Sequence, residues 1–373
     1  MSQPFRVGIL TGGGDCPGLN AVIRAVTKSL ILLNNAEVYG FRDGFQGLIE
    51  QDGEPLEYRD VSGILTRGGT ILGASNKANP FDYHRRGGAD VSAECLHTYR
   101  ELGLDAIVAI GGDGTMSIAH RLSELGLNIV GVPKTIDNDI VGTDRTFGFD
   151  TAVTIATEAI DRIHTTAQSH HRVMIVETMG RYAGWIALHA GVASGSDVVL
   201  IPEFPYEIDD VVDVCARREQ VGQRFTIICI AEGAQPDGGE RAVKKIVADS
   251  PDPVRLGGIG QVLAQQLSGR VASEVRTTVL GHMQRGGTPT PYDRNLSTSF
   301  GAHAARLVAE ERFGVMVALQ GQEFVPFPLE KVADRTRTVP TDDDLIQAGL
   351  AVGTSFGVSD LRTELETQMG ATG

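Results

Sequence analysis

Short apolar runs recur along the 373-residue chain, and most are separated by segments with helical periodicity. Short runs bounded in this way and rich in β-branched residues are typical of buried strands. Strands that alternate with helices predict a mainly parallel sheet with right-handed crossovers, which places the chain in the α/β class. The expected strands are 6–10, 37–41, 105–110, 128–132, 172–177, 197–201, 224–231, 275–280 and 314–319.

The length of the chain favours two domains, because a single hydrophobic core stops growing near ~250–300 residues. A second series of strands and helices begins near Arg172. We therefore place a domain change near residue 150 and expect a cleft between the two parts.

The net charge of −14 limits the partners of this protein. Nucleic acids and anionic membranes require a basic surface, so we expect neither. No window approaches the ~18–20 apolar residues of a membrane span, and the N-terminus has no signal-peptide pattern, so a cytoplasmic location is expected. A phosphate-ester substrate would need a local basic cluster within this acidic protein.

Two carboxylates, Asp137 and Asp139, follow directly on the apolar run that ends at Val132. Ligands of open α/β sheets bind in the crevice beyond the carboxyl ends of the strands, so these side chains should face a ligand. Ordinary turn chemistry is the alternative for an Asp-Asn-Asp sequence.

Two glycine-rich segments, 10–18 (LTGGGDCPG) and 110–115 (IGGDGT), also stand between a predicted strand and a predicted helix. Glycine lets backbone N–H groups approach phosphate oxygens, and the start of a helix favours negative charge. Asp113 could hold Mg²⁺ that bridges donor phosphates. A tight turn without a ligand and a helix-capping Asp are the alternatives. Together the three loops favour a phosphoryl-transfer site.

Phosphoryl transfer to an alcohol requires a group that accepts the hydroxyl proton as the new bond forms, and a nearby carboxylate is suited to this task. In 133–139 (PKTIDND), the Thr135 hydroxyl and the carboxylates of Asp137 and Asp139 could serve as a base, an orienting group and a metal contact. The string 111–114 (GGDG) resembles one shared by kinases of sugar phosphates, NAD and diacylglycerol, so it does not define the acceptor.

The whole ordered set of motifs resembles the phosphofructokinase family, over roughly residues 5 to 335. The resemblance implies two Rossmann-like parallel-sheet domains with the active site in the cleft between them, and transfer of a phosphoryl group to the 1-hydroxyl of fructose 6-phosphate, a step of glycolysis. The larger domain is expected at 1–149 plus about 286–335, the smaller at 150–285, and a C-terminal extension without chemistry at about 336–373. The motifs are 12–15 (GGGD), 111–115 (GGDGT), 133–139 (PKTIDND), 179–184 (MGRYAG), 231–233 (AEG) and 281–287 (GHMQRGG).

By this resemblance, Asp137 is the base that takes the proton of the 1-hydroxyl, with Thr135 beside the transferring phosphoryl group and Asp139 near the metal. Arg181 resembles the arginine that stabilises negative charge on that group. The resemblance also places the backbone of Gly14 beside the transferring phosphoryl group. The phosphoryl donor and Mg²⁺ are expected at Gly14, Asp15, Gly112, Asp113, Gly114, Thr115, Lys77 and Lys134, with Asp113 as the metal ligand.

The resemblance also implies a sugar-phosphate site. Met179 and Gly180 would shape the sugar pocket, and Glu232 would hold sugar hydroxyls. The family is usually homotetrameric, with active sites completed across subunit interfaces by the counterparts of Arg172 and Arg276. Alone, each arginine is more often a surface or ion-pair residue, but its place inside a matched motif favours phosphate. The residues implied for the 6-phosphate are Arg172, Arg276, His282 and Arg285.

The phosphoryl donor depends on few positions. Pyrophosphate-dependent members of the family typically carry Asp where this chain has Gly114, so Gly114 favours ATP. Lys134 occurs with both donors, since an ammonium attracts phosphate of either kind. At the place of Asn76 the familiar bacterial enzyme has an arginine that contacts ATP, and Lys77 could supply that charge.

Three other functions stay open from the sequence. A pyrophosphate-dependent phosphotransferase is the alternative within the family. A lipid or NAD kinase would share the motif at 111–114, but the motif at 282–287 is not expected in such an enzyme. A non-catalytic sensor of sugar phosphates or nucleotides would need to have lost a base, a metal ligand or a clamp, and Asp137, Asp113 and Arg181 are all present.

Overall fold

The computed structural model describes residues 5–246, 254–359 and 361. The weak helical pattern that the sequence shows after about Pro340 ends at 364–369, and this end lies outside the described residues. The described chain forms two compact units. Unit 1 contains residues 5–151 together with Arg285–Arg337, and unit 2 contains 152–246, 254–284, 338–359 and 361. Unit 1 is therefore discontinuous in sequence, and the last described residues belong to unit 2.

Unit 1 is built on a seven-stranded sheet in the order β15-β14-β7-β6-β1-β2-β3. The five central strands are parallel, and the edge strands β15 and β3 are antiparallel to their neighbours. The sequence analysis located the five parallel strands and missed both edge strands. The strands are β1 (Arg6–Thr11), β2 (Glu37–Phe41), β3 (Gly53–Pro55), β6 (Ala106–Gly111), β7 (Ile129–Pro133), β14 (Val315–Gln320) and β15 (Glu323–Pro328).

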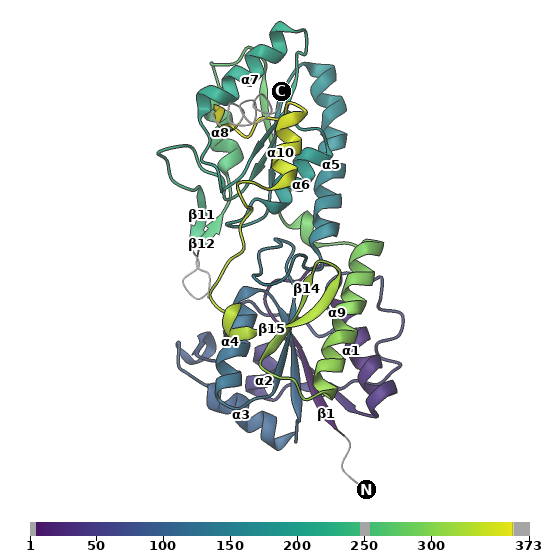
Figure 1. Ribbon diagram of the computed structural model, residues 1–373. Coiled ribbons are helices and arrows are strands. Elements are labelled where there is room, and N and C mark those ends of the chain that lie inside the picture. Colours follow the sequence, from purple (N-terminus) through teal and green to yellow (C-terminus); the bar gives the residue numbers. More distant parts are fainter. Residues whose placement is uncertain (1–4, 247–253, 360, 362–373) are drawn as a thin grey trace. The chain divides into compact units, whose positions relative to one another are not determined.

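Helices cover both faces of the unit 1 sheet, as expected for an α/β fold. Helices α1 and α9 lie side by side on one face, and α2, α3 and α4 lie on the other (Figure 1). The short pair β4 and β5 and two 3₁₀ turns lie in the connections. The bounds are α1 (Leu19–Asn34), α2 (Phe45–Glu50), β4 (Ala78–Asn79), β5 (Asp82–Tyr83), η1 (His84–Arg86), α3 (Ser92–Glu101), α4 (Asp113–Glu124), α9 (Pro291–Ala309) and η3 (Leu329–Lys331).

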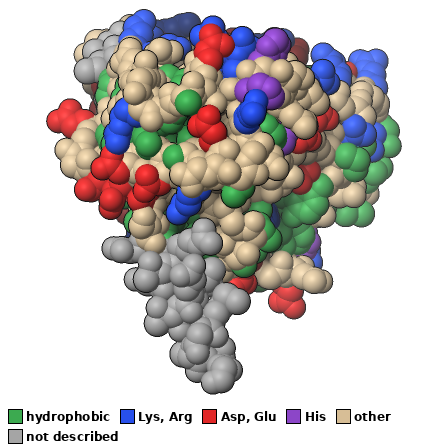
Figure 2. All heavy atoms as spheres, turned by 90° about the horizontal axis from the view of Figure 1, so that it is seen from above, with side chains coloured by type: hydrophobic (Ala, Val, Ile, Leu, Met, Phe, Trp, Pro, Cys, Tyr) green, Lys and Arg blue, Asp and Glu red, His purple; other side chains and the backbone are tan. Residues whose placement is uncertain are grey.

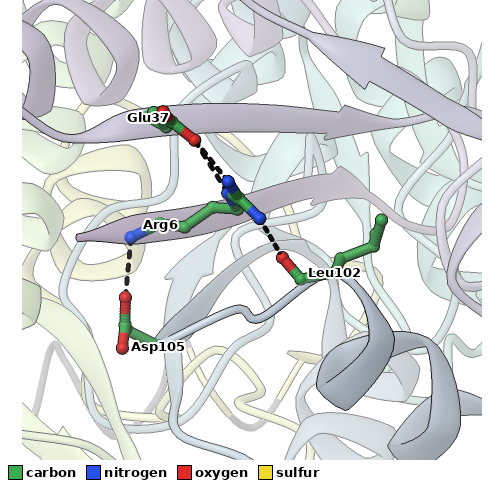
Figure 3. Close-up of polar contacts among 4 residues, drawn as sticks. All are labelled: Arg6, Glu37, Leu102 and Asp105. Atoms are coloured by element: carbon green, nitrogen blue, oxygen red, sulfur yellow. Dashed lines mark hydrogen bonds and ion pairs between the residues drawn. The ribbon is translucent and has the colours of Figure 1, made fainter. Parts of the chain in front are cut away.

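The start of β1 is fixed by Arg6 (Figure 3). Its backbone N–H donates to the Asp105 carboxylate over 2.7 Å, and its guanidinium donates to Glu37 over 2.9 and 2.7 Å and to the Leu102 carbonyl. These contacts tie β1 to the starts of its neighbours β2 and β6. Since pairing register sets where parallel strands end, they help to bring the loops after β1 and β6 to one edge.

Unit 2 has a four-stranded, fully parallel sheet in the order β13-β8-β10-β9. Its core includes Ile175, Leu200, Ile228 and Ile230 from the strands, all with no exposed surface. Helix α5 (Phe149–His170) begins in unit 1 and continues into unit 2. The other elements are β8 (Val173–Thr178), α6 (Trp185–Ala193), β9 (Val198–Leu200), α7 (Ile208–Gln220), β10 (Thr226–Ala231), β11 (Val243–Ile246), β12 (Val254–Leu256), α8 (Ile259–Leu267), β13 (Val275–Val279), η2 (Gly281–Arg285) and α10 (Asp344–Ala351).

The C-terminal segment completes unit 2. Helix α10 packs on α6. Beyond it, the Ser355 carbonyl accepts from the Val199 N–H over 2.8 Å and the Ser355 N–H donates to the Asp197 carbonyl over 2.9 Å. Phe356 is buried. Ser355 therefore lies along the outer edge of β9.

Candidate active site

The loops after β1 and β6 form one packed surface in unit 1. The Gly12 N–H donates to the Ile110 carbonyl over 2.8 Å. A Cβ atom on Gly12 would lie 2.5 Å from Oγ1 of the buried Thr115, and one on Gly111 would lie 2.2 Å from it. No side chain fits at either glycine without displacing Thr115. The sequence analysis attributed these glycines to the access that backbone N–H groups need to phosphate. Close packing against Thr115 is a second reason for glycine at both positions.

Lys134 lies under the first glycine loop. Its side chain is 3% exposed, and its Nζ donates to the Gly14 carbonyl. Its backbone N–H donates to the Gly111 carbonyl over 2.8 Å. A buried ammonium is stabilised only where acceptors or anions compensate its lost hydration. Lys134 thus joins the two glycine loops and places a positive charge beneath them.

The carboxylate loop follows β7 directly. Thr135, Asp137 and Asp139 are 7%, 2% and 6% exposed. The Thr135 hydroxyl accepts from the Asp137 N–H over 3.0 Å. Oδ1 of Asp137 is buried without a hydrogen-bond partner among the described residues. Leaving a buried carboxylate oxygen without a partner is costly, and this oxygen is free to accept a hydrogen bond from a ligand or from water.

The backbone of this loop is held in an uncommon conformation. Asn138, between the two carboxylates, has φ of 53°, in the left-handed region that a short polar side chain tolerates. Its Oδ1 accepts from the Thr146 N–H over 3.0 Å. The Thr146 hydroxyl in turn donates to the Thr135 carbonyl over 2.8 Å. The loop is closed on itself by side chains that flank Asp137.

Asp113 is the first residue of α4, and Gly112 is its N-cap. The positive end of the helix dipole therefore lies at the loop predicted to hold phosphate. Gly114 is exposed, and a Cβ atom there would meet nothing within 4 Å. A small side chain would therefore fit at Gly114 without a clash in unit 1.

Arg285, Asp15 and Lys77 also belong to unit 1. Nη1 of Arg285 donates to the Asp15 carbonyl over 3.3 Å. A Cβ atom on Gly14 would lie 3.1 Å from the same nitrogen. Arg285, assigned from the sequence to the 6-phosphate, thus contacts the glycine loop assigned to the donor. Lys77 is partly exposed just before β4.

In unit 2, the loops after the adjacent strands β8 and β10 pack together. Gly180 and Arg181 have φ of 141° and 52°. The Arg181 N–H donates to Oε1 of Glu232 over 3.1 Å. A Cβ atom on Gly233 would lie 1.9 Å from the Arg181 carbonyl oxygen, so only glycine fits there. The structure brings Gly180 and Arg181 together with Glu232, and Met179, which precedes Gly180, is partly buried.

Glu203 is a positioning residue that the sequence analysis missed. Its Oε1 accepts from the Gly184 N–H over 3.0 Å and from the Val339 N–H over 2.8 Å. Burial raises the pKa of its carboxyl, against the opposite effect of these hydrogen bonds. Its position just after a predicted strand was the available signal. Glu203 fixes the end of the loop that carries Arg181.

Arg172 and Arg276 meet at one carboxylate. Nε of Arg172 lies 2.6 Å from Glu274, and the Arg276 guanidinium also pairs with Glu274. The hydrogen bond from Arg172 is the largest cause that lowers the pKa of Glu274. His282 is exposed in η2. The two arginines, both assigned from the sequence to the 6-phosphate, are neighbours in the structure and share Glu274, which the sequence analysis did not single out.

No helix within residues 5–246, 254–359 and 361 has both the length and the apolar character needed to cross a membrane. No group of three or more His, Cys, Asp or Glu side chains there is arranged to hold a metal. Mg²⁺ bound to nucleotides usually takes one or two carboxylates plus phosphate oxygens, so Asp113 at the open phosphate loop fits that pattern. On the face drawn in Figure 2, acidic and basic side chains are interspersed.

Comparison with known proteins identifies the family. Residues 6–308 match the phosphofructokinase family, and the chain belongs to it. It is 52% identical to "ATP-dependent 6-phosphofructokinase 2" of Clostridium perfringens, over 95% of this chain and 100% of that protein. It is 53% identical to "Pyrophosphate--fructose 6-phosphate 1-phosphotransferase" of Amycolatopsis mediterranei, over 91% of this chain and 97% of that protein.

Solved structures agree with the fold. The chain resembles Pichia pastoris phosphofructokinase with a TM-score of 0.76 and 30% identity. The match covers 98% of this chain and 38% of that chain. It resembles the pyrophosphate-dependent phosphofructokinase from Marinobacter aquaeolei with a TM-score of 0.77 and 20% identity, over 97% of this chain and 91% of that chain. The second likeness bears on the fold alone. The predicted α/β class and family are confirmed.

Proposed function

We propose that this protein transfers the γ-phosphoryl group of ATP to the 1-hydroxyl of fructose 6-phosphate, giving fructose 1,6-bisphosphate and ADP. Family membership and relatives named as ATP-dependent 6-phosphofructokinases support this. The observation that carries it is the buried Asp137 carboxylate with an unsatisfied oxygen, in the unit that also holds the two glycine loops and Lys134. Unit 1 thus holds both a carboxylate that can accept a proton and loops suited to phosphate.

Asp137 accepts the proton of the 1-hydroxyl as the oxygen attacks the γ-phosphorus and the bond to the β–γ bridging oxygen breaks. Lys134 and the N–H groups of the glycine loops hold negative charge of the donor. Bound at Asp113, Mg²⁺ would neutralise phosphate charge. We assign Arg181 to charge on the transferring group, Glu232 to sugar hydroxyls, and Arg172, Arg276 and His282 to the 6-phosphate. We also propose a cytoplasmic homotetramer with active sites completed across subunit interfaces.

Pyrophosphate is the second candidate donor. The 53% identical relative from Amycolatopsis mediterranei is named as a pyrophosphate enzyme, and Lys134 would bind either donor. Gly114 favours ATP, because an added carboxylate at this open position would repel and crowd the additional phosphate of a nucleotide.

A donor assay tests the proposal. Purified protein with Mg²⁺ and fructose 6-phosphate receives ATP or pyrophosphate, and ³¹P NMR follows the new phosphate ester. We expect turnover with ATP, and Gly114→Asp should lower kcat/KM for ATP by about tenfold or more, which corresponds to roughly 1.4 kcal/mol. Gly114→Ala is the control for the loss of glycine. Turnover with pyrophosphate alone would refute ATP as the donor, and no product with either would refute the proposed reaction.

A further inference from the structure

Arg337 contacts the carboxylate loop from a distant part of the sequence. It lies beyond the family match at 6–308, in a segment to which the sequence analysis gave no chemistry. Its backbone N–H donates to the Asp139 carbonyl over 2.7 Å. Its Nη1 donates to the carbonyls of Asn138 and Asp144, each over 3.2 Å. Both the backbone and the side chain of Arg337 are therefore bound to this loop.

These contacts act on the backbone on both sides of a turn. Asn138 precedes the turn at Gly142, which has φ of 91°, and Asp144 follows it. One guanidinium nitrogen that binds both carbonyls holds the two arms together. Hydrogen bonds from a charged donor are stronger than neutral ones, so the guanidinium is a firm connection.

The held backbone carries Asp137. This residue immediately precedes Asn138, and its own side chain lacks a partner at Oδ1, so its direction depends on the backbone. Other ties to the loop include those from Thr146, through Asn138 Oδ1 and the Thr135 carbonyl, and a hydrogen bond from Asn138 Nδ2 to the Asp144 carbonyl over 3.4 Å. Small displacements of a catalytic group reduce the rate strongly, since about 1 Å of misplacement can cost about 10²-fold.

We propose that Arg337 is a positioning residue that holds the left-handed backbone at Asn138 and thereby directs the Asp137 carboxylate at the substrate hydroxyl. The kinetic part of this inference rests on the proposed function. The contact with the loop is independent of it.

The test compares Arg337→Ala and Arg337→Lys with Arg335→Ala. Arg335 is exposed and lies two residues away in the same segment, so it is the matched control for loss of a nearby charge. Hydrogen exchange of peptides that cover 135–146 measures the hold on the loop. Steady-state kinetics with ATP and fructose 6-phosphate measure kcat and KM separately.

In Arg337→Ala we expect faster exchange in the peptides at 135–146, with peptides from β8 and β10 unchanged. We expect kcat to fall by about 10–100-fold while KM for fructose 6-phosphate stays within about twofold, because misdirection of the base affects the transition state. Arg337→Lys should recover part of both, since an ammonium can still donate to a carbonyl. Arg335→Ala should match the wild type.

Exchange and kcat in Arg337→Ala equal to those of Arg335→Ala would overturn the inference. A lower kcat with unchanged exchange at 135–146 would also overturn it. If Arg337→Ala does not fold, the same comparison of Arg337→Lys with Arg335→Ala decides. An inactive wild type refutes the proposed reaction, while the exchange data still show whether Arg337 holds the loop.

Discussion

The loop that carries Asp137 in unit 1 and the arginines of unit 2 hold their charges in opposite ways. In unit 1, Lys134 and Asp137 are almost fully buried, and the backbone around them is tied by hydrogen bonds. In unit 2, the side chains of Arg172 and Arg276 are 27% and 55% exposed and share Glu274. The contrast in exposure agrees with the proposed roles, in which the groups of unit 1 need a fixed position and the arginines of unit 2 need access to solvent.

The physical reason lies in the two proposed tasks. A base works only from a defined position. Burial of the base costs stability, but the fixed geometry that accompanies it raises the rate of the reaction. An anion-binding arginine must be reachable from solvent, and an ion pair at the surface stabilises the fold little. If Arg172 and Arg276 bind the 6-phosphate as proposed, Glu274 would release them at a small loss of stability.

The largest effect is expected for Asp137→Ser, which removes the buried carboxylate of unit 1. We expect kcat to fall by about 10²–10⁴-fold, the usual contribution of a general base, while binding of fructose 6-phosphate is largely retained. Steady-state kinetics and calorimetric titration with the sugar phosphate measure the two effects. Asp342→Ser, at an exposed position, is the control. Turnover of Asp137→Ser near that of the wild type would remove Asp137 from the role of base.

A second buried carboxylate in unit 1 tests the cost of burial itself. Asp293 has no exposed surface, and burial raises the pKa of its carboxyl from 3.8 to about 6. The folded state therefore binds the proton more tightly than the unfolded state, and the free energy of unfolding falls as pH rises from about 4 to about 6, by roughly 3 kcal/mol.

The matched variant for this effect is Asp293→Asn, which has no titrating carboxyl and can still accept from the Thr151 N–H. Urea unfolding at pH 4, 5, 6 and 7 should give a shallower pH dependence for Asp293→Asn than for the wild type. Parallel curves for the two proteins would contradict the raised pKa.

The smallest expected effect concerns unit 2. Arg276→Ala should raise KM for fructose 6-phosphate by about tenfold, with a smaller change in kcat and in KM for ATP, because a lost phosphate contact weakens the ground state and the transition state alike. Initial rates over a matrix of both substrates measure these constants. Arg312→Ala removes an exposed arginine in unit 1 and is the control. A dominant effect on ATP would contradict the assignment of Arg276 to the sugar phosphate.

The parts of this fold that were predicted have local signals. The parallel strands show as apolar runs, and the loops after β1, β6 and β7 show as glycine or Asp at strand ends. The edge strands β3 and β15 were missed because three residues, or a run with two prolines, give no strand pattern. The contact of Arg337 with the carboxylate loop was missed for another reason. Arg337 is 199 residues from Asn138, and no local pattern marks such a contact.

The position of Ser355 along β9 has a practical consequence for anyone who shortens or tags this protein. A chain cut after Arg337 would lose Val339, the partner of Glu203, and would uncover the edge of β9 and the aromatic ring packed against Phe356. Bare strand edges invite self-association. A truncation or an affinity tag should therefore leave the segment 338–356 intact.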